Sequence, residues 1–248
     1  MNDFKIENCA NSVESAIAAQ QGGAYRVELC AGIPEGGTTP SYGDIAIARQ
    51  HLDIRLHVII RPRGGDFLYN ALEQEIMLAD IRMAKQLKVD GVVFGCLTPE
   101  ADVDVPLMKR LMHEAEGLSV TFHRAFDMVR CPEQALEDII DLGCHRILTS
   151  GGKANVELGI DRLKKLQQQA AGRIIIMPGC GVNPDNVARL AEVTGCREFH
   201  FSGRKSVESG MLFRNPEVSM GGTVKIEEYS RDVTDPDRIA AAVNILNR

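Results

Sequence analysis

Eight short apolar runs rich in β-forming residues alternate along the chain with longer stretches of helical period, and this alternation limits the fold more than any other feature. We predict strands at 4–9, 25–30, 55–61, 91–95, 118–124, 145–150, 173–179 and 197–203. We predict helices at 11–23, 72–87, 103–117, 131–144, 159–172, 183–195 and 236–247. Such alternation is typical of parallel βα units, and eight units in 248 residues match a (β/α)8 TIM barrel in count and size. The sequence therefore predicts an α/β fold in which residues 1–248 form a single TIM-barrel domain.

An open, doubly wound sheet is the alternative fold. It is disfavoured because the chain lacks the Gly-x-Gly-x-x-Gly motif of a dinucleotide site. We expect no organic cofactor. The long stretch at about 204–234 is too long for a simple loop, and we interpret it as an insertion after the eighth strand. A lid, a dimer contact and a short extra helix all remain open for it.

Charge and apolar patterning exclude several partners. The net charge is −6, and no basic stripe with interleaved aromatic residues is present, so we expect no nucleic-acid binding. No apolar run approaches the roughly 20 residues that span a bilayer, and the N-terminus lacks a signal-peptide pattern. The seven cysteines include no Cys-x-x-Cys pair, which argues against a zinc ribbon and is typical of free thiols in a reducing compartment. We therefore expect a cytoplasmic protein without a membrane segment.

A Glu-x-Cys motif occurs twice, in "KIENCAN" (5–11) and "RVELCAG" (26–32), each time on a predicted strand. Alternate residues of a strand point to opposite faces. If the apolar residues of the first two strands face the helices, the barrel axis is faced by Lys5, Glu7, Cys9, Arg26, Glu28 and Cys30. The same alternation directs His57, Arg61, Thr121, His123, His200 and Ser202 inward.

Four of these inward residues are candidate catalytic groups: Glu7, Glu28, Arg61 and His123. They come late in their strands, near the carboxyl-terminal face on which TIM barrels keep their active sites. Unpaired buried carboxylates cost several kcal/mol, so the acids need either basic partners or a function. The alternative is a structural ion-pair network that fills the barrel.

The loops at that face add candidate substrate-binding residues. "RPRGGDF" contains Arg63 and Asp66, and "HRAFD" contains Arg124 and Asp127. Guanidinium groups offer a planar fork of donors to a carboxylate or phosphate. Simple surface pairing of Arg63 with Asp66 is the alternative.

The loops after the seventh and eighth strands contain Gly179, Gly181, Ser202 and Gly203. Gly-rich loops in these positions often bind phosphate through backbone N–H groups. Glycine also closes ordinary turns, so this assignment stays open.

The two thiols Cys9 and Cys30 lie just beyond the glutamates on neighbouring strands. Two thiolates side by side could hold a soft ion such as Cu(I), although a single buried cysteine usually serves as a small apolar residue. They are our candidate metal ligands.

The motifs "RVELCAG", "EGGTTPS", "IIRPRGGDF", "VTFHRAFD", "ILTSGG" and "FHFSGR" occur in an order that resembles the CutC family, called copper homeostasis proteins, along nearly the whole chain. The resemblance implies a cytoplasmic barrel, often a homodimer, with a role in copper handling. It places the family's shared polar residues at Glu7, Glu28, Arg61, His123, Arg124 and Asp127, and it makes Cys9 and Cys30 the natural copper candidates.

Three functional hypotheses follow. The first is a copper homeostasis protein that binds Cu(I). The second is an enzyme of lyase or isomerase type that does acid–base chemistry on a small anionic, or phosphorylated, metabolite, with Glu7 or Glu28 as base, His123 as acid and Arg61 holding the anion. The third is a barrel without chemistry that serves as a binding scaffold.

Overall fold

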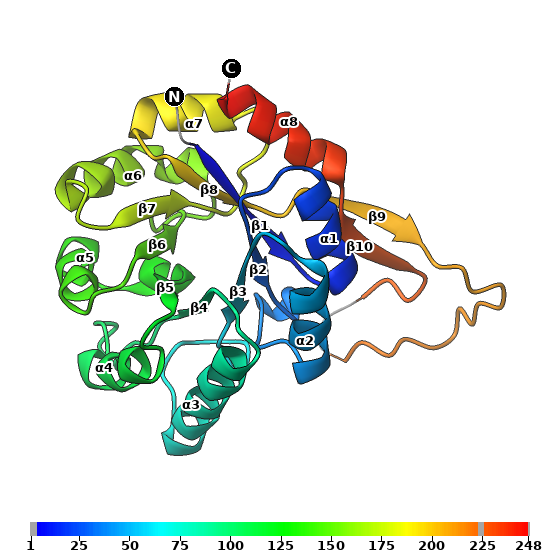
Figure 1. Cartoon of the computed structure of the whole chain (residues 1–248), viewed down its shortest axis with the longest axis horizontal. Coiled ribbons are helices and arrows are strands. Elements are labelled where there is room, and N and C mark those ends of the chain that lie inside the picture. Colours follow the sequence, from blue (N-terminus) through cyan, green and yellow to red (C-terminus); the bar gives the residue numbers. More distant parts are fainter. Residues whose placement is uncertain (1–3, 223–225, 248) are drawn as a thin grey trace.

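Eight parallel strands form the centre of the fold, which confirms the predicted TIM barrel (Figure 1). The structure is a computed structural model and describes residues 4–222 and 226–247. The barrel strands are β1 (Lys5–Ala10), β2 (Arg26–Leu29), β3 (Arg55–Ile59), β4 (Gly91–Phe94), β5 (Ser119–Phe122), β6 (Arg146–Thr149), β7 (Ile175–Pro178) and β8 (Glu198–Phe201). Ladder pairing runs in chain order from β7 down to β1 and then to β8. Strands β7 and β8 lie side by side where the barrel closes, without ladder pairing between their described residues.

Helices surround this ring of strands (Figure 1). They are α1 (Val13–Gln21), α2 (Tyr42–His51), α3 (Ala71–Gln86), α4 (Val105–Glu114), α5 (Pro132–Asp141), α6 (Val156–Ala170), α7 (Val187–Thr194) and α8 (Pro236–Leu246), with short 3-10 helices at Ile33–Glu35 and Arg124–Met128. Side-chain caps start most helices; the Asn70 side chain, for example, accepts from the Glu73 backbone N–H in a capping box. Helix α2 lies outside the predicted ranges, and its sequence signal is the capping box of Ser41 and Asp44.

The strands bury both of their faces. Outward residues such as Ile6, Val27 and Leu56 pack under the helices in the main apolar core. The barrel interior holds mostly polar side chains, all of them buried: Glu7, Arg26, Glu28, His57, Thr121, Arg146, Glu198 and His200. The alternation of the sequence therefore predicts the inward face correctly.

A two-stranded antiparallel ribbon follows the barrel where we predicted an insertion. It consists of β9 (Arg204–Glu208) and β10 (Ser230–Thr234), and the described residues that follow β9 project away from the barrel (Figure 1). The described part of this segment contains no helix, and Met211, Leu212 and Phe213 are exposed on it. Across residues 4–222 and 226–247, no helix combines the length and apolar character that crossing a membrane requires.

Candidate functional site

The register of three neighbouring strands brings the two Glu-x-Cys motifs together. On β1, Glu7 pairs with Arg26 of β2 on one side and with His200 of β8 on the other. Cys9 pairs with Glu28 in the same register. Because these residues share the inward face, their side chains form stacked layers inside the barrel.

The deeper layer is an ion-pair network. The Arg26 guanidinium donates to the Glu7 carboxylate and, at 2.7 Å, to Glu198, which Arg146 also contacts at 3.2 Å. Burial alone would raise the pKa of Glu7, but the charge of Arg26 and the hydrogen bond with His200 hold it well below its usual range. The structural ion-pair network that we considered as an alternative is thus present, and Glu7 belongs to it.

His200 joins this network to the mouth of the barrel. Its Nδ1 lies 2.7 Å from Glu7 Oε1, and its Nε2 lies 3.6 Å from Glu28 Oε2. Burial would lower the pKa of His200, yet the hydrogen bonds with Cys9 and Glu7 raise it well above its ordinary value. Burial, with the charges of Cys9 and Glu7, raises the pKa of Glu28 to about 8, although His200 opposes the shift. Glu28 therefore keeps its proton near neutral pH.

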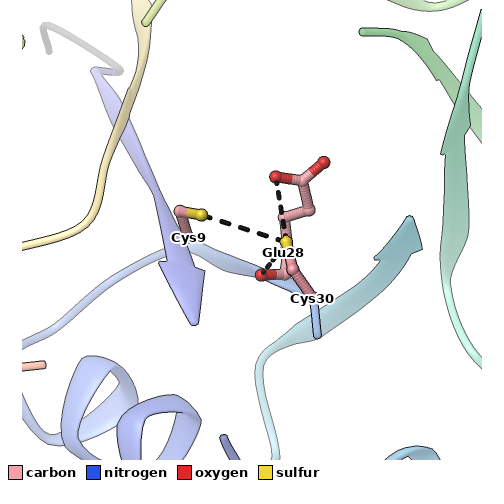
Figure 2. Close-up of side chains that lie close together, drawn as sticks. All are labelled: Cys9, Glu28 and Cys30. Carbon is pink, nitrogen blue, oxygen red and sulfur yellow. Dashed lines mark hydrogen bonds between the residues drawn. The ribbon is translucent and has the colours of Figure 1, made fainter. Parts of the chain in front are cut away.

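The two thiols approach one another in this upper layer (Figure 2). The Sγ atoms of Cys9 and Cys30 are 3.9 Å apart, and Cys30 Sγ lies 3.6 Å from Glu28 Oε2. The hydrogen bond with Cys30 and the neighbouring His200 and Arg204 lower the pKa of Cys9 well below its usual value, while the contact with Cys9 and burial raise that of Cys30. Arg204 Nη2 lies 3.8 Å from the sulfur of Cys9, so a positive charge faces the thiol pair.

A cavity of about 260 Å³ opens beside the thiols. Its polar lining includes Cys9, Glu28, Cys30, Arg61, His123 and His200, so the structure brings these predicted residues into one space. Glu7 lies below it, in the ion-pair layer. Burial, together with the charge of Arg61, lowers the pKa of His123 to about 3, so this imidazole is neutral.

Asp127 lines the cavity, but other groups already occupy its carboxylate. It pairs with Arg124 at 2.7 Å and accepts hydrogen bonds from the hydroxyls of Thr149 and Ser150 and from the backbone N–H groups of Ser150 and Gly152. The carboxylate of Asp127 thus occupies backbone N–H donors of the Gly-rich loop that follows β6.

Several predicted substrate-binding residues lie outside the cavity lining. Arg63 pairs with Asp66 at 2.9 Å and with Glu73 at 2.6 Å on the surface, as the alternative interpretation proposed. The glycines and serine of the last two loops, Gly179, Gly181, Ser202 and Gly203, are not among the lining residues either. Gly179 instead allows close packing, because a Cβ there would come within 2.4 Å of Leu148.

Sequence reasoning placed His200 inside the barrel but assigned it no role, and it missed Arg204 and Phe67 altogether. The alternation of inward and outward residues along the eighth strand was the sequence signal for His200. No local signal marks Arg204, because its approach to Cys9 depends on how β9 leaves the barrel. Phe67 lies between Arg61 and His123, with ring contacts of 5.0 Å to the Arg61 guanidinium and 4.9 Å to the His123 ring.

The thiol pair has the dimensions of a metal site. Ligand atoms of Cys9, Glu28 and Cys30 all lie within 4.8 Å of one another. Two sulfur ligands at about 2.3 Å from a metal ion are at most about 4.6 Å apart, so the 3.9 Å separation of the two Sγ atoms can be bridged. Glu7, Glu28 and His200 form a second such group, but Arg26 already occupies Glu7.

These observations define a class of protein, a TIM barrel with thiols, carboxyl groups and imidazoles at the carboxyl ends of its strands. The CutC family model matches residues 4–205. A CutC family protein of Bacteroides thetaiotaomicron is 62% identical over 247 residues, which cover 99% of both chains. The chain belongs to the CutC family, as its motifs predicted.

More distant relatives agree with this. The human protein named copper homeostasis protein cutC homolog is 49% identical over 249 residues, which cover 99% of this chain and 91% of the human one. A solved structure of CutC from Streptococcus agalactiae has a TM-score of 0.78 and 36% identity, and it covers 80% of this chain and 98% of its own.

Proposed function

We propose that this protein takes part in copper homeostasis by binding one Cu(I) ion between the thiolates of Cys9 and Cys30. The observation that carries the proposal is the 3.9 Å separation of the two sulfur atoms at the barrel mouth. Thiolates are the soft ligands that Cu(I) prefers, and two of them satisfy its low coordination number. The human relative named for copper homeostasis supports the same function.

The surroundings favour a bound cuprous dithiolate, which carries a net negative charge. Arg204 lies 3.8 Å from the sulfur of Cys9, and the raised pKa of His200 keeps a second positive charge nearby. Glu28 would stay protonated beside the site, so it would add no further negative charge.

An anaerobic Cu(I) competition titration in a reducing buffer tests this proposal. The parent protein should bind one equivalent tightly, and a Cys9→Ser, Cys30→Ser double variant should lose that binding. Cys131→Ser removes an exposed thiol at the start of α5 and should leave binding unchanged. Absence of tight binding by the parent, or equal binding by the double variant, would refute the copper site.

An acid–base enzyme of lyase or isomerase type, acting on a small anionic metabolite, is our second candidate. Glu28 favours it, because a carboxyl group with a pKa near 8 in a cavity is suited to proton transfer at neutral pH. His200, whose Nε2 lies 3.6 Å from Glu28 Oε2, would stabilise the carboxylate after Glu28 has released its proton, and Arg61 would hold the anion. Turnover in a screen of phosphorylated and carboxylated metabolites, lost in Glu28→Gln, would support this function, and absence of any turnover would count against it.

We also propose that the protein works in the cytoplasm as a homodimer. Free thiols suit a reducing compartment. The exposed Met211, Leu212 and Phe213 of the projecting segment are large apolar groups of the kind that mark contacts between proteins. Light scattering should give twice the monomer mass for the parent and the monomer mass for a variant with all three changed to Ser.

A further inference from the structure

We propose that the mouth of the barrel holds a second binding site, beside the thiols, for a small organic monocarboxylate that pairs with Arg61 and accepts a hydrogen bond from His123. The site is defined by two buried side chains with unpartnered donors that line the same cavity. It is separate from the two sulfur atoms and does not require a metal ion.

Arg61 is a buried cation without a counter-charge. Its side chain donates to the backbone carbonyls of Glu35 at 3.0 Å, Gly37 at 2.8 Å and Gly65 at 2.8 Å, and the residue is only 5% exposed. Within the described part of the chain it forms no ion pair with a carboxylate, and its Nε has no hydrogen-bond partner. Carbonyl dipoles hold the guanidinium in place but leave its full charge uncompensated, which is costly for a buried ion.

His123 supplies the second unpartnered donor. Its Nδ1 accepts a hydrogen bond from the backbone N–H of Ala125 at 3.3 Å, so in the neutral ring the proton resides on Nε2. That Nε2 is buried and has no partner in the structure as described. The ring of Phe67 contacts both Arg61 and His123, so it fixes the two donors relative to each other.

The rest of the cavity determines the shape of the ligand. Its walls include the apolar side chains Ile33, Ile59, Phe67, Met128 and Leu148. A volume of about 260 Å³ is below the range of roughly 300–1,000 Å³ that is usual for drug-sized ligands. The site therefore suits a short carboxylate with a small apolar body.

The charge of the site favours a monoanion over a phosphate dianion. Arg124, the other arginine of the lining, is already neutralised by Asp127 at 2.7 Å. The same carboxylate of Asp127 occupies the N–H groups of Ser150 and Gly152, so these backbone donors are not available to a phosphate. Arg61, the arginine of the lining that has no carboxylate partner among the described residues, and the neutral N–H donor of His123 together match a carboxylate.

A small monocarboxylate would also be the substrate class of the acid–base enzyme proposed above. Only turnover of the carboxylate rests on that proposed function, whereas its binding does not. Binding is measured without turnover, and it should persist in the Cys9→Ser, Cys30→Ser double variant. Failure of the copper site, failure of catalysis and failure of carboxylate binding are therefore three separate results.

Calorimetric titration with butyrate, butyramide and inorganic phosphate tests the site. Butyramide has nearly the same shape as butyrate but no charge. We expect saturable binding of butyrate, with affinity at least tenfold weaker for butyramide and for phosphate. Arg61→Lys should weaken butyrate binding at least tenfold, because a lysine cannot reproduce the Nε donor, whereas Arg63→Lys changes an arginine outside the cavity and should have no effect.

A measurement on the parent protein covers the case in which Arg61→Lys does not fold. In ¹⁵N-labelled protein, butyrate should shift the Nε2–H signal of His123, and butyramide should not. The proposal is overturned if butyrate does not saturate, if phosphate or butyramide binds as well as butyrate, if Arg61→Lys folds and keeps full affinity, or if the His123 signal stays in place at saturation.

Discussion

The Nδ1 atom of His200 lies 2.7 Å from the Oε1 atom of Glu7, although 193 residues separate them along the chain. The contact exists because β8 pairs with β1 and places the two residues opposite each other. It makes Glu7 the link between the ion pairs at the centre of the barrel and the cavity at its mouth. A change at Glu7 should therefore have two measurable effects, one on the stability of the fold and one on the pKa of His200.

Replacement of Glu7 by Gln should destabilise the fold strongly. The variant leaves the buried Arg26 without one of its two carboxylate partners, and breaking a buried ion pair in this way costs about 3–5 kcal/mol. It should also lower the pKa of His200, which the Glu7 hydrogen bond raises. Chemical denaturation measures the first effect and an NMR titration the second.

Glu157→Gln is a suitable control for this loss of stability. It breaks an exposed ion pair with Arg189, for which about 0–1 kcal/mol is expected. If both variants lose the same stability, the Glu7 pair does not stabilise the barrel core.

Glu28 should make the protein less stable as the pH rises. Its pKa is about 8 in the folded state against an ordinary value of 4.5, so between these values the folded chain keeps a proton that the unfolded chain has released. The free energy of unfolding should fall across this window by up to about 1.4 kcal/mol per pH unit. Glu28→Gln removes this contribution, so the variant should gain stability relative to the parent from pH 5 to pH 8.

Denaturation curves at several pH values check this prediction. Glu100→Gln changes an exposed acid in a turn and should alter stability equally at every pH. A difference between parent and Glu28→Gln that does not vary with pH would mean that Glu28 is ionised in the folded protein.

His123 should remain neutral in the folded protein well below pH 6.5. Its pKa is about 3 because burial and the charge of Arg61 disfavour the imidazolium. The unfolded chain takes up this proton near pH 6.5, so the contribution of His123 to stability should be lost as the pH falls from about 6.5 toward 3. Ring ¹⁵N shifts should report protonated Nε2 and unprotonated Nδ1 down to pH 5, with the exposed His113 as internal reference. Protonation of both nitrogens at pH 5 would contradict the assignment.

Gly159→Ala should be among the most damaging of the glycine substitutions. A Cβ at this position of α6 would lie 1.8 Å from the backbone oxygen of Ser150, so the helix would have to move away from the loop that binds Asp127. Overpacking of this kind costs about 1–3 kcal/mol or more. Gly43→Ala in α2 is the matched control, since its nearest contact would be at 3.7 Å and alanine should stabilise a helix by about 0.5–1 kcal/mol. Thermal unfolding of both variants should show opposite shifts, and a shift of the same sign in both would refute the close approach.

The inward face of each barrel strand could be predicted because alternation is a local property. Each inward polar residue is next in sequence to an apolar residue that faces the helices, and each strand buries both faces. This holds for Glu7, Glu28, His123 and His200. The proximity of Cys9 and Cys30 followed from the same argument, since consecutive strands of a TIM barrel pair in parallel.

Contacts that depend on loop paths could not be predicted in this way. Arg63 and Asp127 both follow inward-facing strand ends, yet Arg63 turns to the surface to pair with Glu73, and Asp127 turns into the loop after β6. The path of each loop depends on packing against neighbouring units, which a single motif does not encode.

The order of residues along this chain was sufficient for the barrel, for its polar interior and for the family, because strand and helix periods are set by near neighbours in sequence. The uncompensated charge of Arg61, the internal anion at Asp127 and the approach of Arg204 to Cys9 arise from contacts between separate loops and strands. Such contacts depend on which groups share a buried space after the barrel has closed, and burial in that space determines which charges are neutralised and which stay available for a ligand.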